Sequence, residues 1–269
     1  MNVDAGGTAL ATVVLMTIDR HDVLLELLAA GRGAADFARN SREGNAVIVG
    51  YLKATFSGLP IVAAESDPAT YRGFDAERSA LFVAVASSSL MLGLAEEGRA
   101  TVGVVLFTGL GGQRRTYAAA EGIGAFLVGD DGTRSPIDVS SVTDLASVRC
   151  IVSGADRGKN VDAKLQSLGC QELVRIGGGG ADCVRVASGE MVLYADPSMI
   201  AVALWDSCAP DAIVRAAGGC FTDGRGTAFY YKKPITYGEG TLAGNPVLHA
   251  EALRRFRDHD LRTGGATMI

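Results

Sequence analysis

Two acidic side chains of this 269-residue chain stand where a carboxylate could take part in chemistry. Glu65 directly follows an apolar stretch, residues 60–64, that predicts a short buried strand, so its carboxylate emerges at a strand end. Asp206 stands where a helix over the following residues would begin. Carboxylate oxygens are the hard ligands that Mg²⁺ prefers. On capping preference alone, however, a plain helix cap is the favoured interpretation of Asp206.

The stretch around Asp206, residues 204–219, carries the signals of a helix that is buried on one face. Pro210 suits a first helical turn, and Gly218 suits a left-handed helix end. Small apolar residues follow the i, i+3, i+4, i+7, i+8 stripe of a helix that lies close against a sheet. They are Ala209, Ala212, Ile213, Ala216 and Ala217.

The same stretch reads Trp-Asp-Ser-Cys-Ala-Pro-Asp-Ala-Ile with Ala-Gly-Gly after it, and it resembles the C-terminal signature of the inositol monophosphatase superfamily. The Cys-Ala-Pro variant, followed by Thr222, Asp223 and Gly226, is most similar to the 3'(2'),5'-bisphosphate nucleotidase branch. The resemblance implies an α/β fold, the layered α/β/α/β/α sandwich of the inositol monophosphatase and fructose-1,6-bisphosphatase type. It also implies hydrolysis of phosphate monoesters with Mg²⁺ as cofactor, and it makes Asp206 a metal ligand.

The family's second source of metal ligands is a Glu-Glu pair at a strand end, and this chain has only one of the two. Alignment of the pair places Ala64 at the usual ligand position and leaves Glu65 beside it. A small local shift would let Glu65 reach the metal, although adjacent strand residues face opposite ways.

The family's third source of ligands is an Asp-Pro-x-Asp-Gly-Thr motif, and it aligns with residues 72–77. Asp75 keeps the second aspartate as a metal ligand, and Ala76 lies among the amides that hold the phosphate. Arg72 replaces the bridging aspartate, and a guanidinium repels a cation. Glu77 replaces the threonine that helps to activate water, where a carboxylate could serve as a base or a ligand. An alternative register uses Asp67-Pro68 as a displaced motif but requires an insertion.

A glycine-rich strand-to-helix turn, residues 175–182, resembles the nucleotide-side loop of the bisphosphate nucleotidases. The resemblance implies that Gly178, Gly179 and Gly180 contact the substrate. Asp182 stands where those enzymes carry a lysine, so one phosphate partner is lost. The alternative is a plain tight turn in which Asp182 only favours the start of a helix.

Two functions follow from these motifs. One is a Mg²⁺-dependent phosphate-monoester hydrolase acting on 3'-phosphoadenosine 5'-phosphate-like nucleotides or inositol phosphates. The other is a catalytically inactive family member with a binding or regulatory role. Because Arg72 replaces an anion that holds the metals and Glu77 adds an anion beside the phosphate, the sequence predicts weakened Mg²⁺ binding and very slow or absent turnover.

Composition and charge limit the classes of partner. Hydrophobic residues make up 48% of the chain and glycines number 35, which indicates a turn-rich globular protein. The net charge of −5 offers no basic surface for nucleic acid, so a phosphorylated small molecule must be bound locally. An apolar run over residues 9–16 follows Asp4 without basic residues, which argues against a signal peptide or a membrane span. We expect a cytoplasmic monomer or homodimer.

Patterns of apolar residues predict the order of helices and strands, and strands alternate with helices in the second half of the chain. We therefore expect two subdomains of one compact unit, an N-terminal α+β part (1–135) and a C-terminal α/β part (136–269). Helices are predicted over residues 21–39, 45–56, 162–168, 181–188 and 209–217. Strands are predicted over residues 60–64, 81–94, 100–107, 149–153, 172–176, 191–194 and 242–244, with a strand pair over 116–126.

The five cysteines are an odd number without Cys-x-x-Cys spacing, which favours buried thiols in a reducing compartment over disulfides or zinc ligands. The three histidines lie in segments predicted to be helical or terminal and are expected at the surface.

Overall fold

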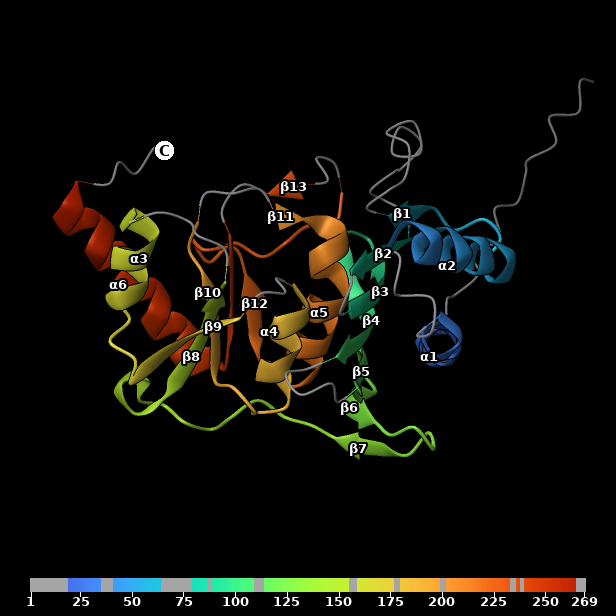
Figure 1. The fold of residues 1–269 in the computed structure, drawn as a ribbon, viewed down its shortest axis with the longest axis horizontal. Coiled ribbons are helices and arrows are strands. Elements are labelled where there is room, and N and C mark those ends of the chain that lie inside the picture. The colour runs from blue at the N-terminus through green and yellow to red at the C-terminus, as the bar shows by residue number, and fades with distance from the viewer. Residues whose placement is uncertain are drawn as a thin grey trace, which may run out of the picture.

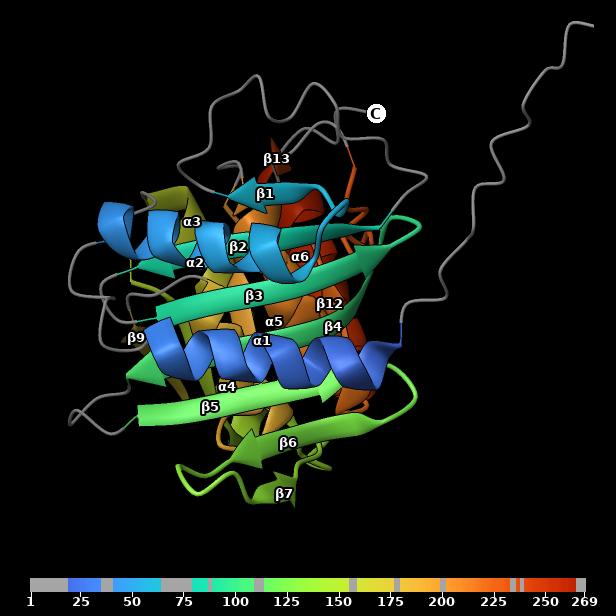
Figure 2. The same cartoon turned by 90° about the vertical axis from the view of Figure 1, so that its right-hand side faces the viewer.

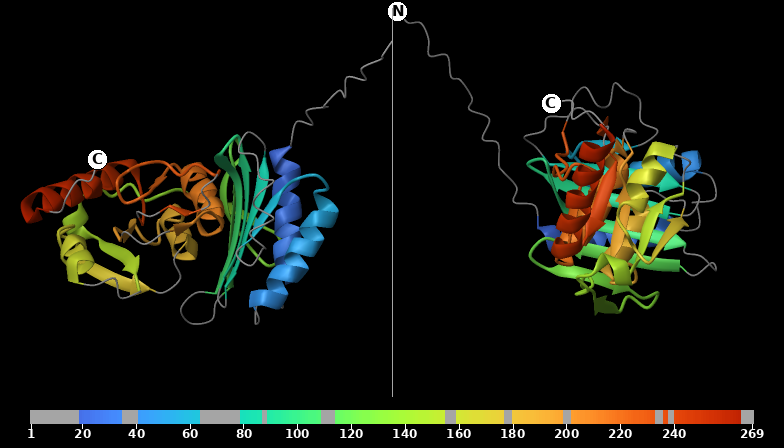
Figure 3. Two further views of the ribbon diagram at one scale, coloured as in Figure 1. Left: turned by 90° about the horizontal axis from the view of Figure 1, so that it is seen from above. Right: turned by 90° about the vertical axis from the view of Figure 1, so that its left-hand side faces the viewer.

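The computed structural model describes residues 19–34, 41–63, 79–86, 89–108, 114–154, 159–176, 180–198, 202–232, 236–237 and 240–264. In this part of the chain, helices and sheets alternate in five layers (Figure 1). The view from above shows the order: a helix pair, a sheet, a central helix pair, a second sheet and an outer helix pair (Figure 3). The predicted α/β/α/β/α sandwich is therefore confirmed.

The three helical layers each contain two helices from different parts of the sequence. The outer layer on one side is α1 (Arg20–Ala34) with α2 (Ser41–Thr55), the central layer is α4 (Gly180–Ala187) with α5 (Leu204–Ala216), and the opposite outer layer is α3 (Lys159–Gln166) with α6 (Pro246–Thr263). The predicted helices are all present, and α6 lies beyond the last of them.

The first sheet has seven strands in sequence order, with α1 and α2 lying across its outer face (Figure 2). Its strands are β1 (Ile61–Ala63), β2 (Ala80–Ala86), β3 (Ser89–Glu96), β4 (Arg99–Thr108), β5 (Arg114–Ala120), β6 (Gly124–Val128) and β7 (Arg134–Pro136). Only β1 and β2 pair in parallel. The single strand predicted over residues 81–94 is in fact the antiparallel pair β2 and β3. Both faces of this sheet carry helices, so the two strands read as continuous apolar runs.

The second sheet has the order β12-β14-β10-β8-β9, in which β8 pairs in parallel with both β9 and β10. Its strands are β8 (Arg149–Ser153), β9 (Glu172–Ile176), β10 (Leu193–Asp196), β12 (Cys220–Thr222) and β14 (Thr241–Gly244). A separate two-stranded ladder pairs β11 (Val202–Ala203) with β13 (Thr236–Tyr237). The first sheet ends at Pro136 and the second begins at Arg149, and the predicted division between residues 135 and 136 stays a prediction.

Close packing of α5 on the first sheet depends on two glycines. A Cβ atom added at Gly93 of β3 would lie 2.7 Å from the sulfur of Cys208, and one added at Gly103 of β4 would lie 3.1 Å from the Cα of Ala209. Any larger side chain at either position would push the helix outward. The stripe of small residues predicted for this helix is buried in the same core.

The cysteine prediction is wrong for one pair. Cys150 at the start of β8 and Cys170 in the turn before β9 form a disulfide, with their Cα atoms 6.5 Å apart. Parallel pairing of β8 with β9 brings these segments together, and no local sequence pattern shows this pairing. Cys183 and Cys208 are buried thiols, as predicted, and Cys220 is half-buried.

Helix α6 is capped at both ends and covers the second sheet. The side chain of Asn245 accepts a hydrogen bond from the amide of Leu248, and Gly264 ends the helix with φ of 66°. His249 is buried, with its Nε2 2.9 Å from the hydroxyl of Thr222, so it is not the surface residue that we expected. Among the described helices, none is long and apolar enough to cross a membrane.

Candidate active site

Helix α5 places Asp206 differently from the sequence prediction. The helix begins at Leu204, and Ala203 is the capping residue, without a side-chain hydrogen bond. Asp206 therefore lies within the first turn and is not the cap. Pro210, expected in the first turn, lies in the interior of the helix.

Pro210 leaves the carbonyl of Asp206 without its usual helical hydrogen bond. Proline has no N–H to bond the carbonyl four residues earlier, and its ring crowds that carbonyl. In α5 this carbonyl belongs to Asp206, which packs directly on Gly180 at the start of α4. A Cβ atom added at Gly180 would lie 2.9 Å from the carbonyl carbon of Asp206 and closer still to its oxygen. Of the three predicted substrate-binding glycines, this one is therefore placed against Asp206.

The carboxylate of Asp206 is half-buried and has no hydrogen bond or ion pair with the residues that the structure describes. Burial raises the pKa of this carboxyl to about 6. A bound cation would lower that pKa again and would find hard oxygen ligands here. Within the described ranges, no group of three or more acidic, histidine or cysteine residues could hold a metal ion. Asp206 is thus the one predicted metal ligand that the structure describes.

The other predicted site residues lie outside the described residues. They are Ala64, Glu65, Arg72, Asp75, Ala76, Glu77, Gly178 and Gly179. The approach of Asp75 to Asp206, which we expect if both ligate one metal cluster, therefore stays a prediction.

Asp182 is the second acidic residue beside the glycine turn, and it is not a helix cap. It lies in the first turn of α4 with 0% of its surface exposed. Neither carboxylate oxygen has a hydrogen-bond partner in the part of the chain that is described. Burial raises the pKa of this carboxyl to about 6, although the charge of Arg185 opposes the rise. The structural role that the sequence offered for Asp182, a negative charge at a helix start, needs no hydrogen bond and is consistent with its place in the first turn of α4.

A buried polar network anchors α5 and begins at Asp211, five residues after Asp206; it was not predicted from the sequence. Asp211 accepts hydrogen bonds from Nε of Arg215 at 2.8 Å and from the hydroxyl of Tyr231 at 2.9 Å. Arg215 also donates to the carbonyl of Ala100 on β4. Burial is the largest effect on the carboxyl and raises the pKa of Asp211. The i, i+4 spacing of Asp211 and Arg215 was the available signal.

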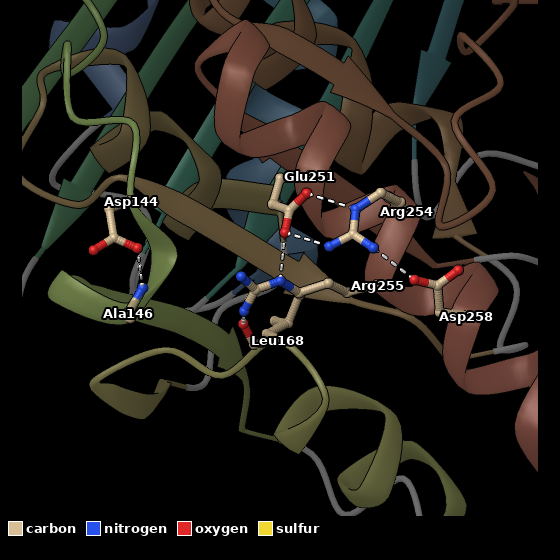
Figure 4. A network of polar contacts seen from close by, with 7 residues as sticks. All are labelled: Asp144, Ala146, Leu168, Glu251, Arg254, Arg255 and Asp258. Carbon is tan, nitrogen blue, oxygen red and sulfur yellow. Dashed lines mark hydrogen bonds and ion pairs between the residues drawn. The ribbon is translucent and has the colours of Figure 1, made fainter.

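An open groove of about 610 Å³ lies elsewhere, between α6 and the short helix η2 (Leu145–Ser147). Figure 4 shows that three of its charged residues are paired: Glu251 accepts from Arg254 and Arg255, and Arg254 also binds Asp258. None of its lining residues belongs to the predicted site. We therefore place the candidate site at the start of α5.

Asp206 thus stands in the first turn of a central helix of a five-layered sandwich, and its backbone carbonyl packs against Gly180. The model of the inositol monophosphatase family matches residues 82–261. The chain belongs to this family, as its Trp-Asp signature predicts.

Two curated relatives carry different activities in their names. The histidinol-phosphatase of Mycobacterium tuberculosis is 33% identical over 168 residues, which cover 61% of this chain and 60% of that protein. The 3'(2'),5'-bisphosphate nucleotidase 1 of Mus musculus is 26% identical over 156 residues, which cover 55% of this chain and 47% of that protein. The chain thus matches about half to three fifths of the length of these relatives.

Solved structures share the fold at low identity. The IMPase of Thermotoga maritima superposes with a TM-score of 0.69 at 18% identity, covering 91% of this chain and 99% of that one. Inositol monophosphatase from Anabaena (Nostoc) sp. PCC 7120 superposes with a TM-score of 0.67 at 20% identity, covering 89% of this chain and 95% of that one. These similarities show the architecture alone.

Proposed function

We propose that the protein is a slow, Mg²⁺-dependent phosphomonoesterase. The observation that carries this proposal is Asp206: its carboxylate is half-buried and has no hydrogen bond or ion pair with the residues that the structure describes, and its backbone carbonyl packs against Gly180. A carboxylate without protein partners on a helix that is fixed by packing suits a metal ligand.

Asp206 would hold Mg²⁺ together with Asp75 and Glu65. The metal, when bound, polarises the phosphate and lowers the pKa of water. Glu77 would accept the proton of the attacking water, and the amides of Ala76 and of the glycine turn would orient the phosphate oxygens. Arg72 and Ala64 stand where metal ligands are expected, so we propose turnover below about 1 per second.

The substrate class is a phosphate ester of a small alcohol. Similarity to the nucleotidases supports 3'-phosphoadenosine 5'-phosphate-like nucleotides, and the family supports inositol phosphates. Similarity to two histidinol-phosphatases, 33% and 32% identical, adds histidinol phosphate as a third candidate.

The test is phosphate release from these three substrates by the purified chain, at saturating Mg²⁺ and again with EDTA. We expect slow, EDTA-sensitive release, and its loss in Asp206→Asn, which keeps the shape of the side chain but removes its charge. Release that persists in Asp206→Asn would point to a contaminant and contradict the proposal. Absence of release from every substrate would also contradict it and would favour the inactive, binding or regulatory alternative.

Metal binding gives a separate readout. We expect calorimetry with Mn²⁺ to detect binding to the native chain and a weaker interaction with Asp206→Asn. The substitution Arg72→Asp should increase metal affinity, because it replaces a repelling cation by a ligand. No gain in Arg72→Asp would contradict the role that we give to this position.

We also propose a cytoplasmic location and a monomeric or homodimeric state. Light scattering on the purified chain measures the oligomeric state. Thiol labelling of the protein in cells tests the location. A Cys150–Cys170 disulfide that stays oxidised in cells would favour an oxidising compartment and contradict a cytoplasmic location.

A further inference from the structure

The buried network around Asp211 joins α5 to other parts of the fold, and the proposed chemistry uses none of its groups. Asp211 is buried and accepts hydrogen bonds from Nε of Arg215 at 2.8 Å and from the hydroxyl of Tyr231 at 2.9 Å. Arg215 donates in turn to the carbonyl of Ala100 on β4. Apolar side chains of similar size are often at least as stabilising as a buried ion pair. The network therefore needs an explanation other than stability.

The packing of α5 on the first sheet leaves one direction poorly determined. Small side chains of the helix lie over Gly93 and Gly103, and these contacts determine how close the helix comes to the sheet. Apolar contacts are non-directional, and small side chains form only low ridges that could stop a helix from sliding along its axis. Hydrogen bonds, in contrast, depend on both distance and angle. The position of α5 along its axis therefore depends mainly on the hydrogen bonds of Asp211 and Arg215.

Tyr231 connects this network with the first sheet. Its side chain is fully buried, and its amide donates to the carbonyl of Gly98, in the turn between β3 and β4, at 2.9 Å. Its ring meets that of Phe82 on β2 edge-on, with the two ring centroids 5.5 Å apart. Because the sheet holds both the backbone and the ring of Tyr231, its hydroxyl is a fixed hydrogen-bond donor for Asp211 on α5.

The part of β2 that Tyr231 contacts lies beside the strand that precedes Glu65. Phe82 is the register partner of Val62 in the parallel pair of β2 with β1, and β1 ends two residues before Glu65. Asp206 lies in the first turn of α5, the helix that the network anchors. The hydroxyl of Tyr231 thus links the helix that carries one proposed ligand with the strand pair that leads to another.

We infer that Tyr231 is a positioning residue of the proposed metal site and acts through its hydrogen bond to Asp211. This bond sets the position of α5 along its axis, and with it the separation of Asp206 from Glu65. The inference rests on the proposed Mg²⁺-dependent activity and names a group that holds its ligands in place. Mg²⁺ requires a nearly ideal octahedron of close ligands, whereas Ca²⁺ accepts longer and less regular coordination. Loss of the hydrogen bond should therefore weaken the binding of Mg²⁺ more than that of Ca²⁺.

The test is calorimetry of the native chain and of Tyr231→Phe with Mg²⁺ and, separately, with Ca²⁺. The substitution keeps the ring against Phe82 and removes only the hydroxyl. We expect the dissociation constant for Mg²⁺ to rise about tenfold or more, and that for Ca²⁺ to rise less than about threefold. The ratio of the two constants separates positioning from a merely structural role, because partial unfolding would reduce the binding of both ions equally.

The matched control is Tyr117→Phe. Tyr117 on β5 is also fully buried in the same core, and its hydroxyl makes no hydrogen bond with a described residue. We expect this variant to keep both native dissociation constants. A second control is the native chain with its Cys150–Cys170 disulfide reduced, which should lose stability in the second sheet and keep the native ratio.

Urea unfolding checks that Tyr231→Phe is folded in the binding assay. If it is not, Asp211→Asn is the second variant, since it weakens the same hydrogen bond by removing the charge of the acceptor and should change the ratio in the same direction. An unchanged ratio in the folded variant overturns the inference, while the proposed function stands if phosphate is released. The expected change of ratio supports the inference even if the native chain releases no phosphate and the proposed function has failed. A native chain that binds neither ion overturns both.

Discussion

Gly180→Ala should damage the candidate site through a single added methyl group. The new Cβ would lie 2.9 Å from the carbonyl carbon of Asp206 and nearer to its oxygen, and 3.4 Å from the sulfur of Met91. Ordinary carbon–carbon contact begins near ~3.5 Å, so the two helices must separate by at least about 0.6 Å at the carbon and by more at the oxygen. The shift acts on the residue that we propose as a metal ligand. A displacement of about 1 Å at such a site can lower activity on the order of 100-fold.

Stability should fall as well, because crowding of a packed interior costs about 1–3 kcal/mol. The assays are urea unfolding, calorimetry with Mn²⁺, and phosphate release. Gly103→Ala is the matched control for crowding, because its Cβ would lie 3.1 Å from the Cα of Ala209, on the same helix but away from the first turn. Gly50→Ala serves as a second control. Gly50 is exposed in α2, and an added Cβ would have no atom within 4 Å, so the variant should raise the unfolding free energy by about 0.5–1 kcal/mol because alanine favours a helix more than glycine does.

The two crowded variants should differ in how stability and metal binding change. Gly180→Ala should lose metal binding and activity beyond what its loss of stability explains, whereas Gly103→Ala should lose stability with a smaller effect on metal binding. If Gly180→Ala keeps native stability and native Mn²⁺ affinity, then the turn does not press on Asp206, and our placement of the site is refuted.

Three further predictions concern stability. Burial lowers the pKa of His249 to about 4, so between pH 6.5 and pH 4 the unfolded chain binds a proton that the folded chain does not. The unfolding free energy of the native protein should therefore fall by up to about 3 kcal/mol, relative to that of His249→Gln, as the pH falls from 6.5 to 4 in unfolding titrations. Reduction of the Cys150–Cys170 disulfide, which closes a loop of 20 residues, should lower the unfolding free energy by about 3 kcal/mol, and an unchanged melting temperature would argue against the pairing. Tyr231→Phe removes a buried hydrogen bond to Asp211 and should cost about 1.5–3 kcal/mol in urea unfolding; a value near zero would show that the network does not anchor α5.

Much of the architecture could be predicted from the sequence because local patterns specify local structure. Apolar periodicity located α1, α2 and the central helices, and alternating strands and helices indicated the α/β second half. The Trp-Asp signature predicted the family, since a long motif that combines a helix start with close packing in one stretch is specific. The stripe of small residues in α5 predicted its close approach to a sheet, which Gly93 and Gly103 permit.

The tertiary structure decided which groups find partners, because pairing depends on segments far apart in the chain. Cys150 meets Cys170 only through strand pairing, and His249 becomes buried only when α6 packs on the second sheet. Capping preferences could not distinguish a capping aspartate from a free one, since hydrogen bonding depends on where the helix begins. Asp206 and Asp182 both stand near helix starts in the sequence, and neither carboxylate has a hydrogen-bond partner among the residues that the structure describes. The sequence by itself determined that carboxylates stand at these helix starts, and the tertiary structure decided their surroundings, because packing leaves Asp206 half-buried and Asp182 fully buried.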